Sequence, residues 1–507
     1  MLPKFSVRSY WAGSSIFTIN TIVHGHFFTG VVKLLRALNH IYELIVNFFA
    51  PALLAFLTTR FIPDYNEIMR RWRVIIIGAA GRDFHNFNTV YREDRNTEVV
   101  AFTAAQIPDI AGREYPAGLA GKYYPKGVPI ESEDKLERLI EDKNANECVL
   151  SYSDLSYWHV MDLASRVIAC GAKFSMLGPR DTMLKSKKPV IAVVAVRTGC
   201  GKSQTTRRVV EILKRAGKKV VSVRHPMPYG DLIKQRVQRF AKIEDLAKQS
   251  CTIEEMEEYE PHIAMGSVIY TGVDYGAILK EAEKEADVIV WDGGNNDMPF
   301  YKPDLTITVA DPLRPGHEVS YYPGAVNFRM ADVIVINKID SAKPEDIETV
   351  IKNAKLVNPR AKIIKAESVL GVEKPNLIKG KNVLVIEDGP TLTHGEMKIG
   401  AGVVAAQRNN AASLVDPRPY AVGSIKATFA IYPDTGMLLP AMGYGKKQMK
   451  DLETTINNTK CDSVVIGTPV DLTRFIKISK PTTRVRYDLS ERATGELAAV
   501  IKKAGVI

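Results

Sequence analysis

Short apolar runs alternate with amphipathic segments along most of this chain. The runs are rich in Val and Ile and continuous rather than alternating, which is typical of strands buried on both faces of a parallel sheet. Segments with apolar residues at helical spacing lie between many of them. This alternation predicts an α/β fold with parallel sheets. The predicted strands include residues 74–77, 99–102, 147–151, 190–195, 219–223, 287–291, 305–309, 333–336, 362–365, 383–386 and 463–467.

The order of these elements predicts three α/β parts after an N-terminal extension. We expect a Rossmann-like domain at 71–187, a parallel-sheet P-loop NTPase domain at 188–375 and a C-terminal α/β extension at 376–507. Residues 1–70 differ, because they are apolar and their basic residues outnumber the acidic ones. The apolar run 44–59 is shorter than the ~20 residues of a membrane-spanning helix. Two interpretations stay open: a membrane-associated segment, or an extension upstream of a true start near Met69.

A glycine-rich turn follows the strand at 190–195 and precedes a segment of helical spacing. Its sequence, VRTGCGKS at 196–203, has the form of a phosphate-binding loop, although Val196 stands where the first glycine is usual. Lys202 would reach the β- and γ-phosphates, and Ser203 would bind Mg²⁺. The helix dipole favours an anion at the same place. The residues predicted to hold the nucleotide here are Gly199, Cys200, Gly201, Lys202, Ser203 and Gln204.

Two later strand ends extend this prediction. The run VIVWD ends in Asp292, which has the place of a Mg²⁺-binding aspartate, with a helix-capping aspartate as the alternative. The run VIVINKID ends in Asn337, Lys338 and Asp340, the pattern N-K-x-D of guanine recognition. The aspartate would accept hydrogen bonds from guanine, and adenine has no matching donors. The motif therefore favours GTP, while ATP stays open as the nucleotide.

Several other polar loops follow strands. Arg224 and His225 follow one strand, and Arg314 and His317 follow another. Each pair would either bind a second anion or form part of a loop exposed to solvent. With Lys202 and Asp292, the pair Arg224 and His225 completes the predicted catalytic set. Glu387, Asp388 and His394 are candidates for acid or base work or for metal binding, with turn formation as the alternative. In the first domain, Arg82, Asp83, His85 and Asn88 are candidates for a ligand site or for a helix cap that faces water.

Composition limits the partners. The net charge of +11 is not gathered into basic runs with interleaved aromatics, so we predict an anionic small molecule and no nucleic acid. No membrane partner is expected, and a homo-oligomer is left open. The five cysteines form no C-x-x-C pair, which argues against a zinc site and a disulfide framework. A reducing cytoplasm is the expected location.

Taken together, VRTGCGKSQTTR, WDGGNND, INKID and EDGPTLTHGEMKIGAG resemble the archaeal cyclic 2,3-diphosphoglycerate synthetase family, which includes relatives labelled predicted GTPases. The resemblance covers about residues 72 to 507. It implies an Mg²⁺-dependent ligase that uses ATP to close a phosphoanhydride in 2,3-diphosphoglycerate and releases ADP and phosphate. Lys202, Ser203 and Asp292 would hold phosphate and metal. The alternative is a GTPase switch or cofactor-delivery factor that acts on a protein partner.

Overall fold

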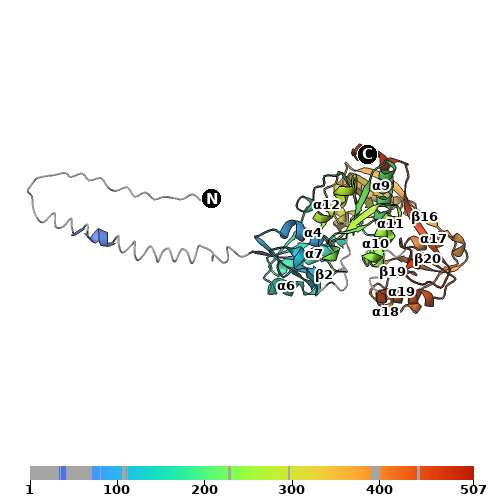
Figure 1. The fold of residues 1–507 in the computed structure, drawn as a ribbon, viewed down its shortest axis with the longest axis horizontal. Helices are drawn as coiled ribbons and strands as arrows, with labels where there is room; N and C mark the ends of the chain where they lie inside the picture. The colour runs from blue at the N-terminus through green and yellow to red at the C-terminus, as the bar shows by residue number, and fades with distance from the viewer. Residues whose placement is uncertain are drawn as a thin grey trace, which may run out of the picture. The chain divides into compact units, whose positions relative to one another are not determined.

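The computed structural model describes residues 33–34, 36–41, 71–79, 81–105, 110, 112–225, 230–294, 297–389, 400–441 and 446–507. Residues 1–70 form one unit and residues 71–507 a second, compact one, to which all that follows refers (Figure 1). The apolar run 44–59, Met69 and His394 lie outside the described residues. Among the described helices, none combines the length and the apolar character needed to cross a membrane.

The second unit begins with a six-stranded sheet, in the order β3-β4-β2-β1-β5-β7. All pairs are parallel except β3 with β4. The arrangement agrees with a Rossmann-like part. Its strands are β1 (Trp72–Ile77), β2 (Thr97–Ala104), β3 (Glu114–Tyr115), β4 (Val128–Ser132), β5 (Glu147–Leu150) and β7 (Lys173–Met176), and its main helices are α4 (Arg82–Asn86), α6 (Leu136–Asp142) and α7 (Tyr157–Ala169).

The rest of the unit shares one long sheet, in the order β10-β11-β9-β12-β8-β13-β15-β16-β21-β20-β17-β18, with β19 beside β17. The pairs from β11 to β16 are parallel, as the sequence predicts for a P-loop domain. These strands are β8 (Val190–Ala195), β9 (Val220–Val223), β10 (Gln238–Phe240), β11 (Val268–Thr271), β12 (Val288–Trp291), β13 (Leu305–Ala310), β15 (Val333–Ile336) and β16 (Lys362–Val372).

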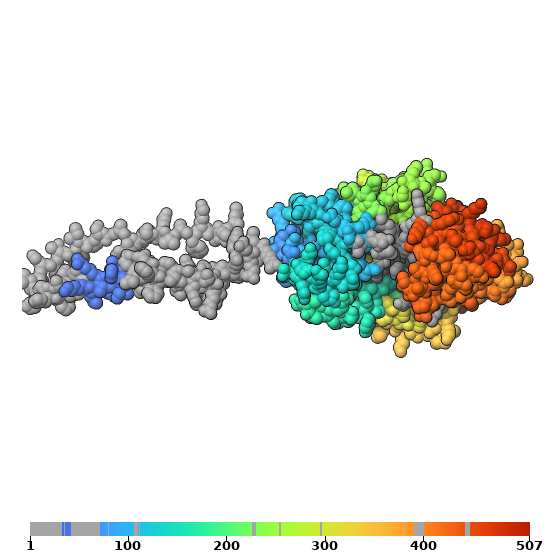
Figure 2. All heavy atoms as spheres, turned by 90° about the horizontal axis from the view of Figure 1, so that it is seen from below, coloured from blue at the N-terminus to red at the C-terminus, as the bar shows by residue number. Residues whose placement is uncertain are grey.

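The C-terminal extension joins this sheet through its last strand. β21 (Thr482–Glu491) pairs antiparallel with β16, and β20 (Ser463–Ile466) and β17 (Asn382–Asp388) continue parallel from it. Figure 2 shows an orange-to-red lobe of residues beyond 400 on the opposite side from the blue and cyan first domain. The last helix, α20 (Glu496–Lys503), packs instead with the core of the P-loop domain. The remaining elements of this lobe include β18 (Ser413–Leu414), β19 (Leu439–Ala441), α17 (Ala401–Arg408), α18 (Gly423–Ile431) and α19 (Lys446–Asn458).

Helices on both faces of β8 bury the core that holds the phosphate loop. On one face, Val209 and Leu213 of α9 (Lys202–Arg215) are fully buried with Ile191 and Val193. On the other face, Val194 packs with residues of α12 (Tyr275–Glu285). Each buried Val or Leu side chain contributes roughly 1.5–3 kcal/mol. This packing fixes the end of β8 and the start of α9, and hence the loop between them.

The first-domain loop predicted as a ligand site lies instead at the junction with the P-loop domain. Arg82 pairs with Asp297 at 3.4 Å, and the ring of His85 stacks on Phe300. Asn88 donates to the carbonyl oxygen of Val273 at 3.0 Å. Arg82 and His85 are buried, so these side chains neither face water nor line a described pocket. The segment that follows β1 therefore packs against the P-loop domain.

Candidate active site

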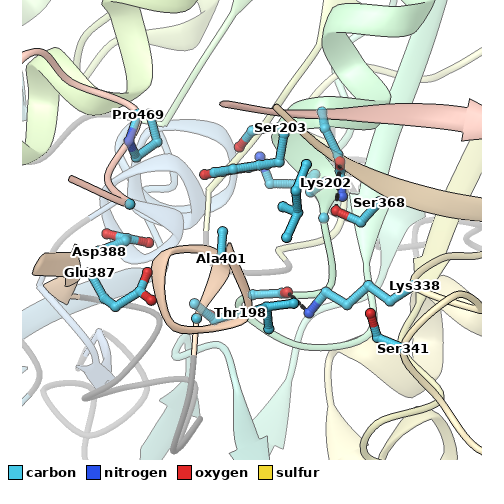
Figure 3. A pocket seen from close by; sticks show the side chains of 18 of the residues that line it. Thr198, Lys202, Ser203, Lys338, Ser341, Ser368, Glu387, Asp388, Ala401 and Pro469 are labelled. Atoms are coloured by element: carbon cyan, nitrogen blue, oxygen red, sulfur yellow. Dashed lines mark hydrogen bonds between the residues drawn. The ribbon is translucent and has the colours of Figure 1, made fainter. Parts of the chain in front are cut away.

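A cavity of about 460 Å³ lies between the P-loop domain and the C-terminal lobe. The phosphate loop and the start of α9 form one wall. The end of β17 and the start of α17 form the wall opposite, and α11 (Ile253–Ala264) contributes two side chains between them. In Figure 3, Glu387 and Asp388 lie on one side and Lys338 and Ser341 on the other, with Lys202 and Ser203 between.

The loop has the backbone that phosphate binding requires. Gly199 and Gly201 have φ of 82° and 102°, which side chains rarely adopt. A Cβ at Gly201 would lie 2.0 Å from Asn337 Nδ2. Gly324 lies against the backbone of Val196, the first loop position: a Cβ on Gly324 would lie 2.0 Å from the Val196 carbonyl oxygen.

Lys202 and Asp292, both predicted from the sequence, meet in the site. Lys202 Nζ donates to Asp292 Oδ1 at 3.0 Å, and Thr206 Oγ1 donates to the same oxygen at 2.5 Å. The other oxygen, Oδ2, lies 2.7 Å from Arg224 Nη1 and 3.1 Å from His262 Nε2. Burial alone would raise the pKa of Asp292, but Lys202 and Arg224 hold it well below its usual value.

This pairing bears on the predicted metal site. Both carboxylate oxygens of Asp292 already accept from cationic donors, so Mg²⁺ would reach them only if Lys202 or Arg224 moved away. Ser203 lines the cavity and fits its predicted place beside phosphate and metal. Within the described residues, no cluster of three or more His, Cys, Asp or Glu side chains is arranged to hold a metal. The metal roles of Ser203 and Asp292 stay predictions.

Arg224 and His225 are adjacent in sequence but point to different places. Arg224 lines the cavity and pairs with Glu258 and Asp292. His225 is absent from the cavity wall, and its Nε2 lies 3.0 Å from Asp297 Oδ2 at the junction with the first domain. Only the arginine of this pair is placed to meet a nucleotide or acceptor, and a catalytic role for His225 would have to act through the junction.

The N-K-x-D motif, which the sequence predicts to recognise guanine, forms hydrogen bonds to the phosphate loop. Asn337 Nδ2 donates to the Cys200 carbonyl oxygen at 2.9 Å, and Lys338 Nζ donates to that of Gly199 at 2.6 Å. Asp340 accepts from the backbone N–H of Ser368 at 3.0 Å. The side chain of Ser368 donates to Gln204 Oε1 at 3.2 Å, which links the motif to α9.

Other contacts to the loop could not be read from the sequence. Asp154 of the first domain accepts from Arg197 Nε at 2.5 Å, and the Arg197 guanidinium lies 3.6 Å from the ring centroid of Tyr321. His317 Nδ1 lies 2.6 Å from Arg197 Nη1, and Arg314 Nη2 donates to the Thr198 carbonyl oxygen at 2.7 Å. The predicted cationic loop with Arg314 and His317 therefore contacts the phosphate loop, and Asp154 of the first domain contacts it as well.

The far wall of the cavity carries carboxylates. Glu387 is buried, and its Oε1 accepts from the N–H of Val403 at 2.7 Å, at the start of α17. Glycines surround it: a Cβ on Gly467 or Gly400 would lie 2.6 or 2.4 Å from Oε2. Burial raises the pKa of Glu387 to about 7, and the charge of Asp388 adds to this. A carboxyl with this pKa can exchange a proton near neutral pH.

Two further glutamates on this side were missed by the sequence analysis. Glu257 and Glu258 of α11 line the cavity, and burial raises the pKa of Glu258. They belong to the stretch IEEMEEYE, whose acidic residues are typical of a helix face exposed to water. In the folded protein the C-terminal lobe packs against this face. Thr468 of that lobe donates to Glu257 at 2.5 Å.

Comparisons with known proteins agree with these observations. Residues 262–367 match the family model described as "Cyclic 2,3-diphosphoglycerate synthetase, P-loop domain". Arginine synthetase ArcE of Thermococcus kodakarensis is 61% identical over 434 residues, which are 86% of this chain and 97% of that protein. Among solved structures, LpxK of Aquifex aeolicus in complex with ATP is 11% identical, over 73% of this chain and 99% of that one. The TM-score for this pair is 0.39.

Proposed function

Because this chain belongs to the family of P-loop synthetases that includes the arginine synthetase of Thermococcus kodakarensis, we propose that it couples the cleavage of a nucleoside triphosphate to the formation of a C–N bond. One observation carries the proposal. A single cavity holds a phosphate loop on one wall and, on the other, a buried carboxyl group whose pKa of about 7 suits proton transfer from an attacking amine.

The identity of 61% with a protein named arginine synthetase makes arginine the proposed product. Exchange of one guanidino nitrogen of arginine for oxygen gives a ureido amino acid, citrulline. Its ureido oxygen would attack the γ-phosphorus, and the bond to the β-phosphate would break. Ammonia would then form a bond to the activated carbon, and phosphate would leave with the ureido oxygen. The nitrogen would give up its proton to Glu387.

The remaining groups of this chain hold and orient the reactants. Lys202 and the loop amides stabilise charge on the phosphates, and Arg224 lies beside them, so that phosphoryl transfer depends on positioning and electrostatics. Mg²⁺, held at Ser203, would neutralise phosphate charge. Asp292 keeps Lys202 and Arg224 in place through hydrogen bonds of 3.0 and 2.7 Å.

The charge of the far wall favours an amino acid over a phosphorylated acid. Four acidic side chains line the cavity on α11 and at the end of β17, so an acceptor with an ammonium group would find hydrogen-bond acceptors there that a diphosphoglycerate could not use. They are Glu257, Glu258, Glu387 and Asp388. Formation of cyclic 2,3-diphosphoglycerate is the second candidate, because the P-loop family model carries that name.

The test is turnover by the full chain with Mg²⁺, ATP or GTP, ammonium and citrulline, followed by mass spectrometry of the amino acids. We expect arginine in amounts equal to the phosphate released. Glu387→Gln should abolish its formation, whereas Glu373→Gln, which alters an exposed ion pair with Arg486, should not.

Two other results would contradict the proposal. A cyclic diphosphate formed from 2,3-diphosphoglycerate, with no arginine formed from citrulline, would establish the second candidate. Hydrolysis that is indifferent to both acids and accelerated by a protein partner would indicate a GTPase factor.

A further inference from the structure

We propose that the first domain completes the phosphate loop, and that Asp154 is the positioning residue through which it does so. Asp154 follows β5 of the first domain, whereas the loop belongs to the P-loop domain. The inference rests on the proposed function only in requiring that the cavity bind a nucleotide.

Asp154 places both of its carboxylate oxygens on the first residues of the loop. Its Oδ1 accepts from Arg197 Nε at 2.5 Å, and its Oδ2 accepts from the backbone N–H of Thr198 at 3.3 Å. The side chain of Asp154 is 6% exposed and that of Arg197 is 1% exposed. Such a buried pair is costly to break, because either partner would keep its charge without compensation. The contact therefore holds the loop entry in one position.

The guanidinium of Arg197 is held by further groups on the same side. It lies 3.6 Å from the ring centroid of Tyr321, and its Nη1 lies 2.6 Å from His317 Nδ1. The ring of His317 stacks on that of Tyr321 at 4.6 Å. Arg197 therefore anchors the second residue of the loop between the first domain and the segment 317–321.

The backbone around Asp154 is built to keep this residue in place. Its φ of 64° is left-handed, a conformation that few residues other than glycine adopt and that aspartate tolerates better than most. Directly after it, β6 (Leu155–Ser156) pairs antiparallel with β14 (Tyr321–Tyr322) of the P-loop domain. A backbone of this kind persists where the surrounding structure determines it strongly, which is typical of functional sites.

The contact with Thr198 determines which groups of the loop can meet the phosphates. Because the N–H of Thr198 donates to Asp154, the amides left for phosphate begin at Gly199. Thr198 also lines the cavity, and its buried hydroxyl has no hydrogen-bond partner among the described residues. A buried hydroxyl gains from a partner, and a phosphate oxygen of the nucleotide would supply one. Asp154 thus orients the part of the loop where the phosphate site begins.

The test is calorimetric titration of the full chain with Mg-ADP and Mg-GDP, which reports binding without chemistry. Variants are compared with the nucleotide that the wild type binds more tightly. Asp154→Asn keeps the shape of the side chain and suits the left-handed backbone, but it carries no charge. It should weaken binding at least about tenfold, because a displaced loop no longer fits the phosphates. The control Asp142→Asn alters an exposed pair with Arg138 in the same domain and should bind like the wild type.

A double-mutant cycle shows whether Asp154 acts through Arg197. Arg197→Met should weaken binding by a similar factor, and the double variant Asp154→Asn, Arg197→Met should bind no more weakly than either single variant. The double variant leaves no buried cation without its counter-ion, so it should fold and show the tenfold loss even if Asp154→Asn alone does not fold. Circular dichroism at the titration temperature identifies the folded variants. A role in stability alone would leave the affinity of the folded protein unchanged.

Wild-type affinity in folded Asp154→Asn or in the double variant would overturn the inference. So would losses that add up in the double variant, because they would come from independent contacts. A wild type that binds neither nucleotide would contradict the proposed function as well. Binding that depends on Asp154 in a protein that makes no arginine would support this inference and refute the proposed function, so the two failures can be told apart.

Discussion

Replacement of Glu387 by glutamine should stabilise the protein at alkaline pH while it removes activity. Glu387 is 2% exposed, and its carboxyl group is surrounded by Gly400, Gly402 and Gly467. An ionised carboxylate at this place loses its hydration, and three backbone contacts from the start of α17 compensate only in part. Glutamine keeps the shape of the side chain and an acceptor for the N–H of Val403, but it carries no charge.

The magnitude follows from the pKa. Burial raises the pKa of Glu387 from 4.5 to about 7. Between these pH values the folded protein binds the proton more tightly than the unfolded chain does, so the free energy of unfolding falls as pH rises. Above pH 7 the cost of the charge reaches about 3 kcal/mol as an upper bound. Below the unfolded pKa both states are protonated, and glutamine and glutamic acid should then be nearly equivalent.

The assay is guanidinium unfolding of the wild type, Glu387→Gln and the control Glu373→Gln at pH 5 and pH 8. Relative to wild type, Glu387→Gln should be stabilised by about 1–3 kcal/mol at pH 8 and by much less at pH 5. The control should follow the wild type at both. A Glu387→Gln variant that is less stable at pH 8, or whose difference from wild type does not change with pH, would refute the reasoning.

Three further substitutions test the site. Lys202→Ala should lower turnover with either nucleotide by about two orders of magnitude or more, since phosphate charge loses its main cation; near-normal turnover would contradict the phosphate-loop assignment. Asp292→Asn should cost about 3–5 kcal/mol in chemical unfolding, because two buried cations lose their counter-ion, whereas Asp287→Asn should cost far less. Gly467→Ala places a Cβ 2.6 Å from Glu387 Oε2, so it should lower the free energy of unfolding by about 1–3 kcal/mol and remove most of the synthetase activity. The control Gly371→Ala, which has open space around it, should leave the turnover rate unchanged.

The sequence predicted the parallel strands and the loop that positions the phosphates. Continuous β-branched runs identify buried strands, and β8 is formed by the residues predicted, 190–195. The ends of neighbouring parallel strands meet at one edge, which is why Lys202 and Asp292 lie together although 90 residues separate them. These features depend on local pattern and on the rules of parallel sheets.

The other half of the site depends on pairing between distant segments. β21 joins the sheet beside β16, and this antiparallel pairing brings the C-terminal lobe over the phosphate loop. Only then do Glu257 and Glu258 change from a charged helix face to a cavity wall. In the same way, Arg408 meets Asp340 across 68 residues, and nothing in the pattern N-K-x-D reveals that contact.

The central claim, that phosphoryl transfer activates the oxygen of an acceptor, can be measured directly by phosphorus NMR. The full chain would be incubated with Mg-ATP, ammonium and citrulline labelled with ¹⁸O in its ureido group. The account predicts that the released phosphate carries the label, seen as an isotope shift of its resonance, and that arginine forms in equal amount. Unlabelled phosphate, released at the same rate without citrulline, would contradict it.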